Sequence, residues 1–202
     1  HFCLLILVIN AWLHRSTLKP EQLNPSWFIP AVGNVLVSIT GVDHGYVEVS
    51  WFFFSIGLLF WMVLTPIIFS RLVFQPALPP KLMPTVFILI APPAVGFLAY
   101  VKLTGEFDSF ARVLYYSALF FTILIASQTS RFIKLPFMLS SWAYSFPLAA
   151  IASATWTVYT FTGSAAMKWL ALAFLVIATI VIGLLFVLTI RAQLRKQICV
   201  PD

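Results

Sequence analysis

Long runs without a charged residue dominate this sequence. Six stretches of 18 to 33 residues contain no Asp, Glu, Lys or Arg. A helix that crosses the hydrocarbon core of a bilayer needs about 20 predominantly apolar residues. Only 9% of the residues are charged, whereas a soluble domain carries about 25%. The sequence therefore predicts an all-α polytopic membrane protein with complete spans at about 24–42, 49–70, 83–102, 109–128, 135–157 and 166–190.

The first residues predict an incomplete span. The segment HFCLLILVINAWLHR places 12 residues between His1 and the His14–Arg15 pair. Its basic residues follow the apolar stretch, which is the reverse of their order in a signal peptide. We therefore expect a partial helix at about 1–13. It would open a single transmembrane domain over 1–202 that is truncated at its N-terminus.

The basic residues gather on one side of the predicted membrane. Because successive loops alternate sides, nine of the twelve Lys and Arg residues fall on the side of the C-terminus and three on the other. The positive-inside rule then predicts a cytoplasmic C-terminus. Topology accounts for the basic surplus, and no motif supports nucleic-acid binding. Four acidic residues lie on the side that is poor in Lys and Arg: Asp43, Glu48, Glu106 and Asp108.

Prolines recur at matched positions in alternate spans. Pro30, Pro93 and Pro147 lie in the first, third and fifth complete spans, in the segments IPAVG, PPAVG and SFPLAA, at spacings of 63 and 54 residues. Each span is followed by one without a central proline, so the repeating unit is a hairpin of one broken and one regular helix. Irregular backbone at membrane depth must be buried or face water. This predicts a lumen lined at the kinks and at the small residues Gly33 and Gly96; the alternative is a set of bends without function.

Phe146 lies at the midpoint of 135–157, directly before Pro147. A ring beside a kink at the membrane midplane can occlude a narrow pore sterically and by dewetting. The alternative is that Phe146 is one of 20 phenylalanines that pack or face lipid. Phe137 follows Pro136 near Lys134, at the membrane surface, and is a poorer candidate for a gate.

The predicted spans lack the groups that drive coupled transport or catalysis. No Asp, Glu, Lys, Arg or His falls centrally in a complete span, and such groups usually mark proton relays. No nucleophile–base pair or metal-ligand spacing appears, so we expect no enzyme, cofactor or metal site. Asn34 either lines the lumen or bonds carbonyl groups freed near Pro30. Ser140, Ser141 and Ser145 either coordinate an anion or bond back to their own helix.

Four segments carry a resemblance to a known family. NPSWFIPAVGN, VSWFFFSIGLLFW, APPAVGF and LPFMLSSWAYSFPLAA resemble the tellurite-resistance/C4-dicarboxylate transporter family, which includes bacterial TehA and the plant guard-cell slow anion channels. The resemblance implies ten helices in five hairpins around a central pore, of which this chain holds the fourth, in part, to the tenth. It implies that Pro30, Pro93 and Pro147 kink inner helices and that the pore-blocking phenylalanine is Phe146. It also implies a homotrimer.

The function expected from these observations is a passive anion channel in the bacterial inner (plasma) membrane. Its partners would be small inorganic or organic anions and membrane lipid. One alternative is a carrier of a C4-dicarboxylate such as malate, of tellurite or of sulfite. A carrier typically pairs its substrate with an arginine, and the predicted spans hold none at depth. Another alternative is a membrane scaffold, which would gain nothing from broken alternate helices.

Overall fold

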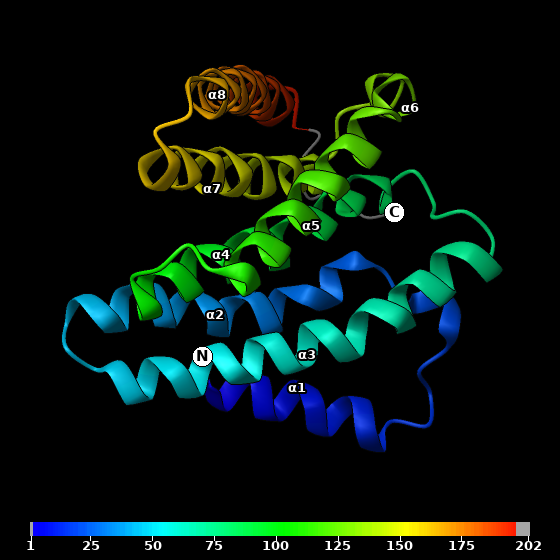
Figure 1. Cartoon of the computed structure of the whole chain (residues 1–202). Coiled ribbons are helices and arrows are strands. Elements are labelled where there is room, and N and C mark those ends of the chain that lie inside the picture. The colour runs from blue at the N-terminus through cyan, green and yellow to red at the C-terminus, as the bar shows by residue number, and fades with distance from the viewer. Residues whose placement is uncertain (1, 197–202) are drawn as a thin grey trace.

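The computed structural model describes residues 2–196, and these are helical apart from turns and loops. In Figure 1 the main helices lie roughly side by side, from α8 at the top through α7, α4 and α2 to α3 and α1 at the bottom. The α-helices are α1 (Phe2–His14), α2 (Ile29–Asp43), α3 (Val47–Phe74), α4 (Ala91–Thr104), α5 (Ser109–Ala126), α6 (Thr129–Ile133), α7 (Ser145–Thr162) and α8 (Ala165–Leu194). The 3-10 helices are η1 (Pro20–Gln22), η2 (Pro25–Phe28), η3 (Met83–Ile90) and η4 (Leu139–Tyr144).

Five helical stretches within residues 2–196 are long and apolar enough to cross a membrane. Each overlaps one of the six complete spans expected from the sequence. The sixth expected span, 135–157, falls on η4 and α7, which are helical but do not reach the same mean hydropathy. The five stretches are Pro25–Asp43, Val47–Phe74, Met83–Thr104, Ser109–Ala126 and Ala165–Leu194.

Hydroxyl side chains explain the lower hydropathy of η4 and α7. The segment from Leu139 to Thr162 carries eight Ser and Thr residues. Most of these hydroxyls donate hydrogen bonds to a backbone carbonyl three or four residues earlier, which satisfies them without water. The helix is therefore compatible with an apolar environment in spite of its composition. The donors are Ser145, Thr155, Thr157, Thr160 and Thr162.

Each proline-bearing span changes its helical geometry at the proline. The chain runs as a 3-10 helix through η2, η3 or η4 and continues as an α-helix in α2, α4 or α7. Pro30 is the second residue of α2, Pro93 the third of α4 and Pro147 the third of α7. Proline is tolerated in the first turn of an α-helix because the backbone N–H that it lacks has no partner there. The expected kink thus takes the form of a 3-10 to α transition.

A left-handed glycine follows each of these three helices. Gly45, Gly105 and Gly163 are the glycines with positive φ in the described chain, at 80°, 73° and 64°. A residue with a Cβ would be strained in this conformation. Because each glycine lies in the turn to the next regular helix, the turns repeat along with the prolines. In the second turn, Asp108 caps α5, and its pKa is lowered by hydrogen bonds from the Ala111 N–H and the Tyr100 hydroxyl.

The hairpins α2–α3, α4–α5 and α7–α8 form an inner and an outer row. Helix α4 lies at the centre and packs against α2, α3, α5 and α7. In the most apolar part of Met83–Thr104, 67% of the residues are buried, against 22% in Val47–Phe74 and 17% in Ala165–Leu194. Helix α1 packs on α2, and the Trp12 and Trp27 rings stack with their centroids 4.6 Å apart. The broken helix α4 therefore lies in the interior, and the outer helices α3 and α8 expose most of their surface.

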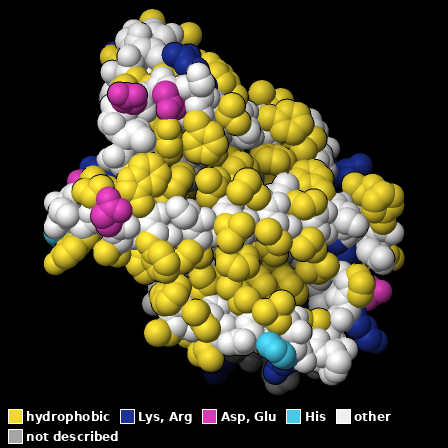
Figure 2. All heavy atoms as spheres, turned by 60° about the horizontal axis from the view of Figure 1, so that its bottom comes forward, with side chains coloured by type: hydrophobic (Ala, Val, Ile, Leu, Met, Phe, Trp, Pro, Cys, Tyr) yellow, Lys and Arg dark blue, Asp and Glu magenta, His cyan; other side chains and the backbone are white. Residues whose placement is uncertain are grey.

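The exposed surface is apolar over a wide area. Figure 2 shows a face covered largely by hydrophobic side chains, with charged side chains mostly toward its edges. On α3 the exposed hydrophobic residues include Phe52, Leu59 and Met62. A continuous apolar surface of this extent is unusual on a soluble monomer and fits contact with lipid. The chain is thus an integral membrane protein with several apolar spans.

Helices α2 and α3 approach each other closely near Gly41. A Cβ atom built on Gly41 would overlap the Oγ of Ser50. The Ser50 hydroxyl donates to the Tyr46 carbonyl at 2.7 Å, and the Ser50 carbonyl accepts a bond from the Ser38 hydroxyl at 2.8 Å. Ser38 and Ser50 are fully buried. Small residues at such a crossing allow helix backbones to pack closely.

This crossing predicts different effects for two Gly-to-Ala substitutions. Gly41→Ala displaces the Ser50 hydroxyl, and the lost hydrogen bond costs about 0.5–1.5 kcal/mol. Gly183→Ala in α8 meets no atom within 4 Å, and alanine favours the helix by about 0.5–1 kcal/mol. Thermal unfolding in detergent should show a lower Tm for Gly41→Ala than for Gly183→Ala. Equal Tm values would contradict the close approach.

Candidate functional site

The three broken helices surround one groove of about 470 Å³. Its floor lies along η3 and the start of α4, and its walls come from η2 and α2 on one side and η4 and α7 on the other. The lining residues are Ser26, Ile29, Val32, Gly33, Leu36, Thr85, Ile88, Ala91, Leu139, Ser140, Trp142, Ala143, Phe146 and Pro147. The groove therefore lies at the 3-10 to α transitions and contains lining residues from all three.

The lining is apolar apart from three hydroxyls and one indole. No charged residue is among the described lining residues. The Thr85 hydroxyl donates to the Leu82 carbonyl at 2.6 Å, and the Ser26 hydroxyl donates to Asn24 Oδ1 at 2.6 Å. Trp142 Nε1 donates to Thr189 Oγ1 of α8 at 2.9 Å and so fixes the groove wall to the outer row. Ser140 Oγ is buried and has no hydrogen-bond partner within residues 2–196.

Two large apolar side chains project at the transitions. Phe146 is 43% exposed and Ile29 is 56% exposed, although each lies directly next to a buried residue in the chain. Pro147, next to Phe146, is buried and also lines the groove. The aligned residue of the middle broken helix, Pro92, instead lines a small separate cavity between α2, α3 and α4. Phe146 is thus the largest exposed side chain of the three aligned positions.

The sequence-predicted lining residues divide into two groups. Gly33 and Pro147 line the groove together with Phe146. Pro93 is buried inside α4 and Gly96 lies against Leu114 of α5, 3.8 Å from a Cβ built on the glycine, and also lines the small cavity. Pro30 is half-buried, and neither Pro30, Pro93 nor Gly96 is among the groove residues. These three residues therefore lie at or near the chain breaks beside the groove, and other residues form the groove surface.

The hydrogen bonds show which polar side chains bond to the backbone and which one has no such partner. Asn34 is fully buried, and its Nδ2 donates to the Pro30 carbonyl at 2.6 Å. Ser145 bonds back to the Trp142 carbonyl at 2.7 Å, and Ser141 Oγ accepts the Met138 N–H at 3.3 Å. Among the three serines, Ser140 alone lines the groove, and its hydroxyl is the one without a partner in the described chain.

Sequence reasoning missed Ser26, Thr85 and Trp142. They lie in the 3-10 segments, four, eight and five residues before Pro30, Pro93 and Pro147 respectively. These offsets follow no common register, because η2, η3 and η4 differ in length from 4 to 8 residues. A motif aligned on the prolines therefore carries no signal for the residues that line the 3-10 half of the groove.

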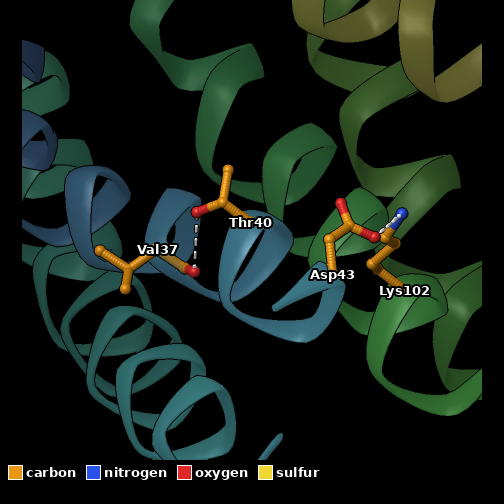
Figure 3. Close-up of polar contacts among 4 residues, drawn as sticks. All are labelled: Val37, Thr40, Asp43 and Lys102. Carbon is orange, nitrogen blue, oxygen red and sulfur yellow. Dashed lines mark hydrogen bonds and ion pairs between the residues drawn. The ribbon is translucent and has the colours of Figure 1, made fainter. Parts of the chain in front are cut away.

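An ion pair joins the inner helices at the opposite end from the 3-10 segments. Lys102 Nζ of α4 lies 2.7 Å from Asp43 Oδ1 at the end of α2 (Figure 3). One turn earlier, the Thr40 hydroxyl donates to the Val37 carbonyl at 3.3 Å. The Lys102 and Asp43 side chains are 42% and 55% exposed. Water and salt therefore screen the pair strongly.

Comparison with known proteins identifies the family. The model of the voltage-dependent anion channel family, SLAC1, matches residues 1–190. The chain belongs to this family. It is 31% identical to the S-type anion channel SLAH3 of Arabidopsis thaliana over 189 residues, which are 93% of this chain and 30% of that protein. The family resemblance inferred from the sequence motifs is thereby confirmed.

Two further relatives show the range of the family. The chain is 28% identical to the guard cell S-type anion channel SLAC1 of Arabidopsis thaliana, covering 100% of this chain and 36% of that protein. It is 27% identical to the tellurite resistance protein TehA homolog of Haemophilus influenzae, covering 89% of this chain and 54% of that protein. The chain thus spans about a third of the length of its plant relatives. The family consists of anion channels, not enzymes.

The Asp43–Lys102 pair predicts a small, salt-sensitive coupling. In a double-mutant cycle with Asp43→Asn and Lys102→Gln, the coupling free energy should be below about 1 kcal/mol, as for other exposed pairs. It should decrease further as the salt concentration rises, because the Debye length is about 8 Å at physiological ionic strength. The measurement is the free energy of unfolding in detergent at low and high salt. A coupling that salt leaves unchanged would indicate that the pair is buried in the assembled protein.

Proposed function

We propose that this chain forms one wall of a passive anion pore, with the groove as part of its lumen and Phe146 as its gate. The observation that carries the proposal is the convergence of all three broken helices on one groove, with an exposed phenylalanine at one of the three transitions. Membership in the anion channel family supports the choice of anions as the permeating species. In this reading η4 and α7 form a sixth membrane span.

The residues that line the groove favour passage of an anion without coupling to proton movement. A proton-coupled carrier uses ionisable groups along its pathway, and the described lining residues include none. A constriction of apolar side chains closes a pore by excluding water, and it opens when those side chains move. Phe146 and Ile29 supply such a constriction. A pathway of this kind selects by diameter and by the few hydrogen-bond donors on its wall.

The donors on the wall are weak and neutral, which suits a permeating anion. A binding site must hold an ion strongly enough for entry and weakly enough for exit. Ser140 lines the groove, and its hydroxyl has no competing hydrogen-bond partner in residues 2–196. We therefore include Ser140 as an anion contact of the pore.

The assembly and orientation are further parts of this proposal. The end of the bundle that holds most Lys and Arg residues would face the cytoplasm under the positive-inside rule. Its positive potential would concentrate anions at that mouth. A homotrimer in the plasma membrane, with one pore in each protomer, agrees with the resemblance described above. Cross-linking in the membrane and accessibility of a cysteine introduced near the C-terminus test these two points.

The gate predicts a gain of current in Phe146→Ala. A half-buried phenylalanine ring gains about 1.5 kcal/mol from its apolar contacts, and a barrier lowered by that amount raises a rate about tenfold. We therefore expect anion conductance to rise about tenfold in oocytes or planar bilayers. The test uses the natural protein that includes this chain.

A matched control separates gating from loss of an aromatic ring. Phe186 is 60% exposed on α8 and is not among the groove residues, so Phe186→Ala should leave the conductance near that of the wild type. Unchanged current in Phe146→Ala at equal surface expression would contradict the gate. Saturable flux that requires a proton gradient would contradict the passive pore and favour a carrier of dicarboxylate, tellurite or sulfite.

The anion contact predicts a difference between two serine variants. Ser140→Ala removes the unpartnered hydroxyl of a lining residue, whereas Ser145→Ala removes a hydroxyl already bonded to the Trp142 carbonyl. One neutral hydrogen bond contributes about 0.5–1.5 kcal/mol. In the Phe146→Ala background, Ser140→Ala should shift relative permeabilities among nitrate, chloride and sulfate by several-fold. Ser145→Ala should leave them unchanged; equal shifts in both variants would remove Ser140 from the pathway.

A further inference from the structure

Another cavity lies outside the groove, at the C-terminal end of α3. It has a volume of about 430 Å³ and is lined by Pro20, Leu23, Pro66, Ile67, Ser70, Arg71 and Gln75. The first two residues come from the connection between α1 and η2, and the others from α3 and the residue that caps it. The cavity therefore combines an apolar floor with the side chains of an arginine, a serine and a glutamine.

Arg71 is buried in this cavity and has no counter-ion among residues 2–196. Only 4% of its surface is exposed. Its Nη1 donates to the Pro76 carbonyl at 2.7 Å, and its Nε is buried without a hydrogen-bond partner in residues 2–196. An arginine side chain stays protonated in proteins. Burying that charge without a negative partner is costly, and a bound anion would offset this cost.

The described chain supplies no carboxylate to Arg71. Glu21 directly follows Pro20 at the rim, but it is exposed and forms no ion pair with Arg71 in residues 2–196. Pro76 contributes a neutral carbonyl dipole. The C-terminal end of α3 adds a partial negative charge of about half an elementary charge, which favours an arginine there but leaves Nε unbonded.

We propose that Arg71, with Ser70 and Gln75, binds a phosphate-type oxyanion. A guanidinium presents several N–H donors in a planar fork that fits the oxygens of a phosphate. Ser70 and Gln75 add neutral donors to the lining of the cavity. The oxyanion is either the headgroup of an anionic phospholipid or free inorganic phosphate.

The surroundings of Arg71 suit the lipid form of this ligand. Leu23, Pro66 and Ile67 give the same cavity an apolar lining. On the outer helix α3, Val63 and Ile67 are 46% and 42% exposed, two turns and one turn before Arg71 respectively. An acyl chain running along these residues would place its phosphate at the end of the helix. The site is separate from the groove, since the two cavities share no lining residue.

The test measures ligand-induced thermal stabilisation of the purified natural polypeptide in detergent. Phosphatidylglycerol, phosphatidylcholine and inorganic phosphate are compared with chloride at equal ionic strength. Wild-type protein should gain Tm with phosphatidylglycerol or inorganic phosphate but not with phosphatidylcholine. Stabilisation by the lipid alone assigns the headgroup as ligand, and stabilisation by both assigns a general phosphate site. No stabilisation by either overturns the proposal.

Substitutions identify the residues that bind. Arg71→Gln should weaken binding at least about tenfold, since a charge-assisted hydrogen bond contributes about 1.5–3 kcal/mol. Arg131→Gln removes an exposed arginine of α6 and should leave the affinity unchanged. Equal loss in both variants indicates non-specific attraction and overturns the proposal.

A second pair of variants tests the proposal even if Arg71→Gln does not fold. Ser70→Ala retains the charge and should weaken binding several-fold, while Glu21→Gln removes a negative charge near the rim and should strengthen it. If Glu21 is instead the hidden partner of Arg71, Glu21→Gln will lower the Tm of the ligand-free protein and leave the affinity unstrengthened. That outcome overturns the assignment of Arg71 as the oxyanion site. Full affinity in both single variants, Ser70→Ala and Arg71→Gln, overturns it as well.

Discussion

The hydrogen bond that a proline cannot donate shapes the interior of this protein. Inside an apolar medium each unpaired backbone group costs several kcal/mol, so a chain break must lie where the missing donor matters least. Pro30, Pro93 and Pro147 each fall in the first turn of an α-segment. The 3-10 helix before each one keeps most of the backbone bonded while it changes the path of the chain. The breaks then need shelter from lipid, which the outer helices provide.

That requirement explains the two rows of helices. α4 is the most buried segment and contacts both neighbouring inner helices, whereas α3 and α8 expose most of their surface. The same arrangement leaves one groove at the transitions. Hydroxyl-rich α7 can stand beside it because its Ser and Thr side chains bond to its own backbone. The shelter of the chain breaks and the proposed pathway thus depend on the same three transitions.

Charged side chains act at the ends of the helices rather than in the groove. Lys102 and Asp43 pair at one end, where water screens them. Arg71 is buried at the C-terminal end of α3, in a cavity of its own. The expected span 49–70 ended before this arginine, but α3 continues to Phe74. A basic residue in the last turn is favoured by the helix dipole, so a charge marks the end of the apolar run without ending the helix.

The sequence by itself determined the helical class, the membrane environment, the hairpin repeat and the position of each chain break. These follow from two local properties, the length of the uncharged runs and the missing N–H of proline. Only the tertiary structure decided which residues share a surface. It brought Ser26, Thr85 and Ser140 from three 3-10 segments to one groove and placed Gly96 against Leu114. Side-chain direction depends on the rotation of each helix about its axis, and packing against neighbouring helices sets that rotation.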